Sequence, residues 1–227
     1  ELDGNTQTRD ITITAVNDAP VLDNSATMML TTITEDQTTN SGNSVASIIS
    51  SAGGDRITDV DSGAVEGIAI TATTNGNGTW EYSTNGGTNW TAVGTVSNTS
   101  ALLLRETDLV RFVPDGVNGT TGDITFRAWD QTTGTAGTKV TTASNGGTTA
   151  FSSATEVAAI TVTAVNDAPT ITNAYTHTLT TTNENTTSSG TLASAILTGS
   201  TWSDVDTGAV SGLARSEEHT SELQSLT

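Results

Sequence analysis

The sequence contains no cysteine, which excludes a disulfide framework and any thiolate metal site. It also shows no signal peptide and no apolar run of about 20 residues, so we expect any targeting or anchoring element to lie outside this fragment. Histidine is nearly absent, since only His177 precedes the final 13 residues. A His-Glu-x-x-His metal motif is therefore excluded, no Ser-His-Asp arrangement is indicated, and we expect no enzymatic activity.

Positive charge is scarce as well. Seven basic residues stand against 25 acidic ones, which gives a formal net charge of −18. Such a chain repels nucleic acid and anionic membranes and attracts cations, so neither of the first two is expected as a partner. Leu, Ile, Val and Phe make up only about a fifth of the residues, close to the composition of disordered chains, and threonine makes up another fifth. Recurring strand patterns nevertheless favour a folded protein.

The C-terminal segment of residues 215–227 has a separate character. Its residues 215–225 match one reading frame of a common short-read sequencing adapter, and the segment resembles an artefact joined to a truncated open frame. We therefore exclude it from the fold prediction. Without its one arginine and three glutamates the net charge is still −16, so the electrostatic argument holds.

An internal repeat organises the remainder. Residues 11–20 read ITITAVNDAP, and residues 160–169, located 149 positions later, read ITVTAVNDAP. The motif DVDSGAV at residues 59–65 recurs as DVDTGAV at residues 204–210, at an offset of 145. Self-similarity at a fixed period is typical of an array of like units, and a small difference in offset is what a surface loop tolerates.

The repeat predicts the following boundaries. We expect the last strand of a preceding repeat at 1–16, a linker at 17–20, a complete repeat at 21–165, a second linker at 166–169, and the truncated start of the next repeat at 170–214.

Within the repeat the patterns predict β-structure. Alternating apolar and polar residues favour half-buried strands, and Asn-Gly and Gly-Gly pairs favour tight turns. No window shows sustained helical periodicity, so helix is expected to be nearly absent, and many short strands with frequent turns indicate an antiparallel β-sandwich whose last strand is Ile160–Val165. We expect a long loop or an extra hairpin at 131–155. The predicted strands cover residues 11–15, 28–33, 67–73, 109–113, 123–129 and 157–165.

The linkers carry the candidate chemistry. Val16-Asn17-Asp18-Ala19-Pro20 ends a strand, and Pro20 makes the connection short and stiff. Asp18 and the Asn17 amide oxygen are hard ligands, and calcium takes six to eight oxygens. The alternatives are a purely structural connector and a calcium site built from two neighbouring domains.

These motifs resemble the cadherin-like repeats of giant bacterial surface adhesins, whose linkers contain Val-Asn-Asp-Ala-Pro. Glu35 matches the first-strand glutamate of cadherins, Asp59-Val60-Asp61 the Asp-x-Asp element, and Ala128-Trp129-Asp130 the Ala-x-Asp element. The chain departs from the family in its longer unit and in its linker, where Ala15 replaces the first Asp and one residue fewer precedes the proline. The resemblance implies an all-β fold of tandem cadherin/immunoglobulin-like sandwiches with Ca²⁺ as the cofactor.

The resemblance also implies how the ligands divide between the two ends of the repeat. At the first linker we expect Asn17, Asp18, Asp59, Asp61 and Asp130. At the second linker we expect Glu35, Asn166, Asp167, Asp204 and Asp206.

A hairpin with two tryptophans offers an alternative. Residues 83–90 resemble the Asp-box hairpin of sialidase-like propellers, with Asn85 in place of Asp, but only one copy exists where a propeller needs several. Trp80 and Trp90 are read either as a staple of this hairpin or as a sugar-binding platform.

Three functions follow from these features. The first is a calcium-rigidified structural or adhesive repeat of an extracellular bacterial surface protein, whose partners are neighbouring repeats and, for the whole array, other cell-surface proteins or glycans. The second is a carbohydrate-binding module, and the third is an accessory domain of a secreted glycosidase. The first is preferred.

Overall fold

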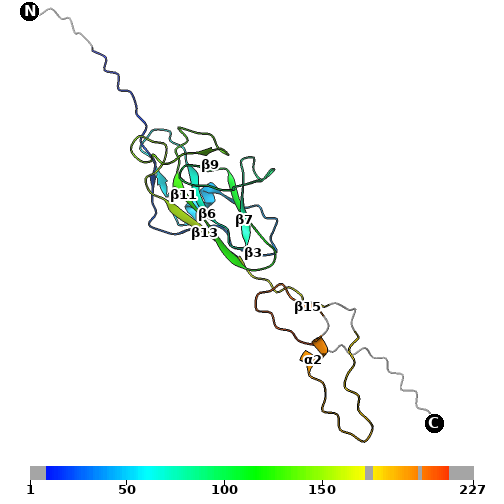
Figure 1. Cartoon of the computed structure of the whole chain (residues 1–227). Coiled ribbons are helices and arrows are strands. Elements are labelled where there is room, and N and C mark those ends of the chain that lie inside the picture. Colours follow the sequence, from blue (N-terminus) through cyan, green and yellow to red (C-terminus); the bar gives the residue numbers. More distant parts are fainter. Residues whose placement is uncertain (1–8, 172–175, 199–200, 215–227) are drawn as a thin grey trace, which may run out of the picture. The chain divides into compact units, whose positions relative to one another are not determined.

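The computed structural model describes residues 9–171, 176–198 and 201–214. The chain divides into two compact units, Glu1–Val165 and Asn166–Thr227 (Figure 1). The adapter-like residues 215–227 lie outside the described residues.

Strands dominate the first unit, as Figure 1 shows, so the predicted all-β class is confirmed. The strands β6, β10, β11 and β13 lie where the alternating patterns predict them. The strands β7 and β9 were not predicted, and the strand predicted at 28–33 is divided into the two short strands β2 and β3. The strands are β1 (Val21–Leu22), β2 (Met28–Met29), β3 (Ile33–Thr34), β4 (Asn43–Ser44), β5 (Ile57–Thr58), β6 (Gly67–Thr74), β7 (Gly78–Ser83), β8 (Thr91–Ala92), β9 (Ala101–Arg105), β10 (Leu109–Pro114), β11 (Thr120–Ala128), β12 (Lys139–Val140) and β13 (Glu156–Thr163).

Two larger sheets form the unit. One has four strands in the order β4-β10-β7-β8, and the other has seven in the order β12-β9-β6-β11-β13-β2, with β3 also paired to β13. The expectation of purely antiparallel pairing is wrong at one edge, because β2 and β3 run parallel to β13. The chain runs in the same direction in β2, β3 and β13, and the pairing is therefore parallel. The last strand, β13, ends two residues earlier than predicted.

One hydrophobic core lies between the two sheets. Alternate residues of β10 and β11 are buried, as expected for strands with one face turned inward. Phe112 packs edge-on against Trp80, with ring centroids 5.1 Å apart. Apolar side chains from both sheets fill this core, among them Ile68, Ile70, Trp80, Leu102, Leu104, Val110, Phe112, Ile124, Phe126 and Ile160.

The 131–155 segment covers the other face of the larger sheet. It carries only the short strand β12, which pairs with β9, so the alternative of an extra hairpin is wrong. Ala150 and Phe151 of this segment bury themselves against Leu103 and Trp129, which forms a second, outer cluster. The 131–155 segment is mostly polar, yet its few apolar side chains complete a second hydrophobic cluster on this face of the sheet.

A short helix, α1 (Val45–Ser50), was not predicted. The Ser44 hydroxyl caps it by accepting from the Ser47 N–H at 3.1 Å, and Val45, Ile48 and Ile49 are buried. Six residues are too few to show a helical period in the sequence.

The second unit repeats the opening of the first. Its elements are β14 (Thr170–Ile171), α2 (Ala193–Leu197) and β15 (Trp202–Ser203). Ile171 pairs with Trp202, just as Leu22 pairs with Ile57 in the first unit. Leu22 is 4% exposed because it belongs to the main core, whereas Ile171 is 49% exposed. The described part of the second unit contains no counterpart of the strands β6–β13.

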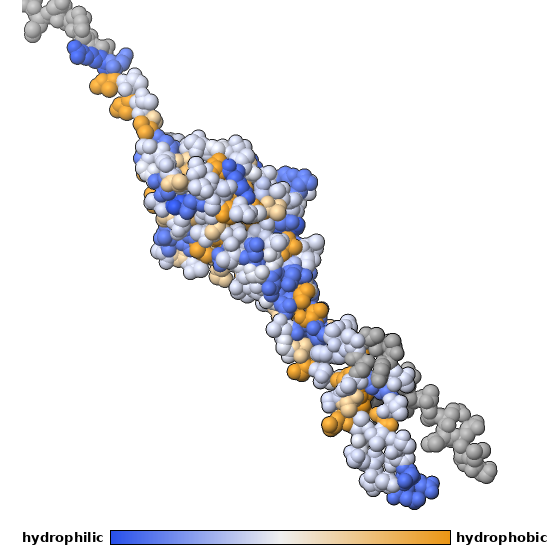
Figure 2. All heavy atoms as spheres, in the orientation of Figure 1, coloured by the Kyte–Doolittle hydropathy of each residue, from blue (hydrophilic) through white to orange (hydrophobic). Residues whose placement is uncertain are grey.

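The N-terminal segment behaves differently from its copy in β13. Residues 9–20 form no strand, although residues 11–15 were predicted as one, and Ile11 and Ile13 are more than four-fifths exposed. Figure 2 shows orange, hydrophobic groups along this segment. Among the described residues, this segment pairs with no strand of the first unit.

Candidate metal centres at the two linkers

The first linker, residues 17–20, is held by the first unit. Pro20 is buried, and the chain enters β1 directly after it. The Asp18 N–H donates to the Asp61 carboxylate at 2.8 Å. The Asp61 N–H in turn donates to Asp59 at 2.9 Å, which shapes the DVDSGAV loop so that Asp61 faces the linker.

Asp130 binds the same linker from the end of β11. It is only 4% exposed, and its Oδ2 accepts from the Asn17 side-chain amide at 2.9 Å. Its Oδ1 accepts from both the N–H and the hydroxyl of Thr132, at 2.8 and 2.6 Å. Both oxygens of this buried carboxylate are therefore used, which fixes its direction toward the linker.

Unused oxygens remain beside this arrangement. Asp59 Oδ2 is buried and has no hydrogen-bond partner among the described residues, and the loop borders a cleft of about 460 Å³ together with Asn17, Asp61 and Asp130. Among residues 9–165, however, no three acidic side chains place one oxygen each within 4.8 Å of one another. The donor set suits calcium in chemistry, and an ion here would need to complete its six or more ligands with carbonyls or water.

Glu35 lies at the other end of the first unit and is fully buried, at 0% exposure. Its backbone N–H donates to Thr163 at 3.1 Å, and its Oε1 accepts from the Val165 N–H at 2.8 Å. Its Oε2 is buried without a partner among the described residues. A buried carboxylate is costly unless it is paired or binds a metal, so Glu35, placed beside the residue before the second linker, fits a cation ligand.

The second linker, residues 166–169, repeats the pattern of the first within its own unit. The Asp167 N–H donates to Asp206 at 2.9 Å, as that of Asp18 does to Asp61. The Asp206 N–H donates to Asp204 at 2.9 Å. The Asn166 amide donates to the Asp167 carbonyl at 2.9 Å, matching Asn17 and Asp18 at 3.1 Å. Two sequence repeats thus give the same linker geometry.

The structure brings the predicted residues together in two sets, one in each unit. The first is Asn17, Asp18, Asp59, Asp61 and Asp130, and the second is Asn166, Asp167, Asp204 and Asp206. Bridging from Glu35 to the second set involves both units and stays a prediction.

Glu66, which follows the DVDSGAV loop, was not predicted as a site residue from the sequence. Together with Asp55, Asp59 and Asp61 it lines a second cleft, of about 290 Å³. Partial burial raises the pKa of the Glu66 carboxyl, and the negative charges of Asp55 and Glu106 raise it further. The signal available in the sequence was its position directly after a predicted ligand loop. Excess negative charge at this end of the unit adds to its attraction for cations.

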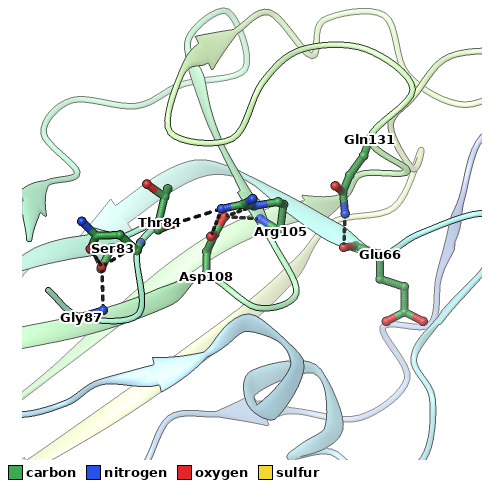
Figure 3. Close-up of polar contacts among 8 residues, drawn as sticks. Glu66, Ser83, Thr84, Gly87, Arg105, Asp108 and Gln131 are labelled. Atoms are coloured by element: carbon green, nitrogen blue, oxygen red, sulfur yellow. Dashed lines mark hydrogen bonds and ion pairs between the residues drawn. The ribbon is translucent and has the colours of Figure 1, made fainter. Parts of the chain in front are cut away.

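The tryptophan hairpin is a structural feature. Ser83 Oγ accepts from the Gly87 N–H at 2.9 Å (Figure 3). Asn85 Oδ1 accepts from the Asn89 N–H at 2.9 Å, so the turn is closed by its own side chains. Trp80 is 3% exposed and donates to the Thr74 carbonyl. Trp90 lies over the Arg111 guanidinium at 4.1 Å. With one ring in the core, the pair does not form a flat sugar-binding platform.

A search of protein-family models found no match to this chain, and the same holds for searches of curated proteins and of solved structures. No helix in the described part of the chain is long and apolar enough to cross a membrane. The function is therefore inferred from the repeat, the charge and the geometry of the two linkers.

Proposed function

We propose that this chain is a piece of an array of cadherin-like β-sandwich repeats on the bacterial cell surface. Its role is structural and adhesive: calcium binds at the linkers, stiffens the array and lets it project a binding region. The fragment itself performs no catalysis, and its direct partners are the neighbouring repeats.

The observation that carries the proposal is the state of Glu35. Glu35 is fully buried, and within the described part of the chain one of its oxygens has no partner. Such a carboxylate costs several kcal/mol unless a cation or another donor compensates it. The carboxylate accepts from Val165, the residue directly before the second linker. A calcium ion at this end of the repeat supplies the missing charge, and carboxylates are the ligands it prefers.

The duplicated linker supports the same function. Both linkers use an aspartate N–H bound to the second carboxylate of an Asp-x-Asp loop. Because the same hydrogen bond recurs in both units, we infer that it forms at each junction of the array. In repeat proteins each unit contacts only its neighbours, so the junctions share one structure.

The sandwich assignment rests on the two larger sheets and their common core. Side chains from both sheets contribute to one apolar cluster, which is how two sheets pack face to face. The proposed array also suits the strong negative charge, because bound cations reduce the repulsion between carboxylates.

A calcium titration of residues 10–214 tests the proposal. We expect saturable calcium binding by calorimetry, and a ligand that binds only the folded state stabilises it by about 2.7 kcal/mol at a hundredfold excess over the dissociation constant. Thermal melting followed by circular dichroism should therefore show a higher melting temperature in calcium than in chelator at matched ionic strength. Magnesium at the same concentration is the control for general screening. Equal melting in calcium and chelator would refute the proposal.

A further inference from the structure

The 131–155 segment reaches from the outer cluster to the first linker. Its Gly147 carbonyl accepts from the Ala19 N–H at 2.8 Å, and its Thr149 carbonyl accepts from the Asn17 side-chain amide at 3.3 Å. These contacts join residues more than 120 positions apart. They supply two bonds to the linker in addition to those from Asp61 and Asp130.

The tip of this segment is well supported. The Gly146 N–H donates to the Phe151 carbonyl at 2.7 Å, and the Thr149 N–H donates to the Gly146 carbonyl at 3.2 Å. Phe151 is 6% exposed and packs with Trp129 in the outer cluster. The carbonyl groups that face the linker therefore belong to a turn tied to a buried aromatic side chain.

The start of the segment is fixed too. The Gln131 amide donates to the Glu66 carbonyl at 2.6 Å, as Figure 3 shows. The Trp129 indole N–H donates to the Thr133 carbonyl at 2.7 Å. At the other end, the Ser152 N–H donates to the Ala128 carbonyl of β11 at 3.1 Å. Because both ends are bonded in this way, the tip at residues 145–149 has little freedom to leave the linker.

The two linkers differ in the hydrogen bonding of the alanine that precedes the proline. Both read Val-Asn-Asp-Ala-Pro, and the N–H of the aspartate is bound in each. The Ala19 N–H has the Gly147 carbonyl as acceptor, whereas no acceptor is found for the Ala168 N–H among the described residues. The acceptor of Ala19 comes from the 131–155 segment, and the second unit has no counterpart of that segment in this sequence.

We propose that the 131–155 segment is a clamp that holds the preceding linker in place without a cation. The inference rests on the proposed function in treating residues 17–20 as the connection between two repeats. It changes what calcium does there: the ion adds stability to a linker that is already ordered. In this array each complete repeat fixes the linker in front of it through its own backbone.

Amide hydrogen exchange on the full chain tests the clamp. Ala19 and Ala168 have identical neighbours from Val to Pro, so their unprotected exchange rates are the same and one serves as the reference for the other. In chelator we expect the Ala19 amide to exchange at least tenfold more slowly than the Ala168 amide. Equal rates in chelator, with protection of Ala19 only after calcium is added, would overturn the clamp.

A matched pair of variants identifies the acceptor. Gly147 has φ +60° and open space around it, so Gly147→Val forces the turn to rearrange without a clash elsewhere. It should reduce the protection of Ala19 to that of Ala168. Gly86→Val makes the same change at another open glycine with φ +68° and should leave the protection of Ala19 intact. Full protection of Ala19 in Gly147→Val would also overturn the proposal.

Calorimetric calcium titration of the same samples separates the two proposals. Calcium binding without protection of Ala19 in chelator refutes the clamp and leaves the proposed function standing. Protection of Ala19 without any calcium binding supports the clamp and refutes the proposed function.

Discussion

Replacing Glu35 by glutamine separates the charge of this side chain from its hydrogen bond. The glutamine carbonyl can still accept from the Val165 N–H, as Glu35 Oε1 does at 2.8 Å. What changes is the second oxygen, which in wild type is buried and has no hydrogen-bond partner among the described residues. The Glu35→Gln variant removes an uncompensated charge when no cation is present, and it removes a charged ligand when calcium is present.

The two effects have opposite signs. An uncompensated buried charge costs about 3–5 kcal/mol, and the unpartnered amide that replaces it costs about 1–3 kcal/mol. In chelator the variant should therefore be more stable than wild type by about 2 kcal/mol, or about 4–8 °C for a unit of this size. In calcium at a hundredfold excess, wild type gains about 2.7 kcal/mol. We expect the variant, which lacks the charged ligand, to gain less than about 0.7 kcal/mol, and the order of stability then reverses.

Thermal melting in chelator and in calcium, at matched ionic strength, measures both signs. Asp36→Asn is the control, since it makes the same change of net charge at the exposed neighbouring residue. We expect it to alter stability by less than about 0.5 kcal/mol in either condition. If Glu35→Gln lowers stability equally in both conditions, the charge of Glu35 is compensated without a cation, and the reasoning is refuted.

Two further predictions concern the first unit. Burial and the nearby acidic groups raise the pKa of Glu66, so its contribution to stability is present below its usual value near 4.5 and is lost as the pH rises through the raised value. Glu66→Gln should consequently stabilise the protein at pH 7 in chelator and have little effect near pH 4; urea unfolding at both values checks this, and an equal effect at both would contradict it. Phe112→Ala removes a fully buried ring that packs on Trp80 and should cost about 3–5 kcal/mol in urea unfolding. The partly exposed Trp90 is the control, and Trp90→Ala should cost about 1 kcal/mol, because the contact it loses is mainly the one with a cation.

The strands with one inward face were determined by local pattern. In β10 and β11 each buried residue is followed by a less buried one, and this alternation is visible in the sequence. The strand β9 escaped prediction because it is covered on both faces: Leu102 and Leu104 contribute to the main core and Leu103 to the outer cluster. A strand buried on both sides is a continuous apolar run, which has no period to detect.

For the linker residues too, the sequence predicted part of the site and the tertiary structure decided the rest. The repeated motifs and the order of the acidic residues indicated Asn17, Asp18, Asp59, Asp61 and Asp130 before any contact was known. Only the tertiary structure decided that Asp130, 113 residues away, binds Asn17 with one oxygen while the other is used by Thr132. A hydrogen bond between segments far apart in the chain depends on how the sheets bring them together. The distance in space between two such residues cannot be read from the sequence.

The backbone contacts of the 131–155 segment lie wholly beyond sequence reasoning. Every residue has a backbone carbonyl. The amino-acid sequence therefore does not distinguish the Gly147 carbonyl, which accepts from the Ala19 N–H, from any other carbonyl. By itself, the sequence determined the repeat, the strand pattern and the acidic linkers, because these depend on side-chain type and spacing. The tertiary structure decided which oxygens are buried, which are already bound and which remain for a cation, because these depend on the packing of segments far apart in the chain.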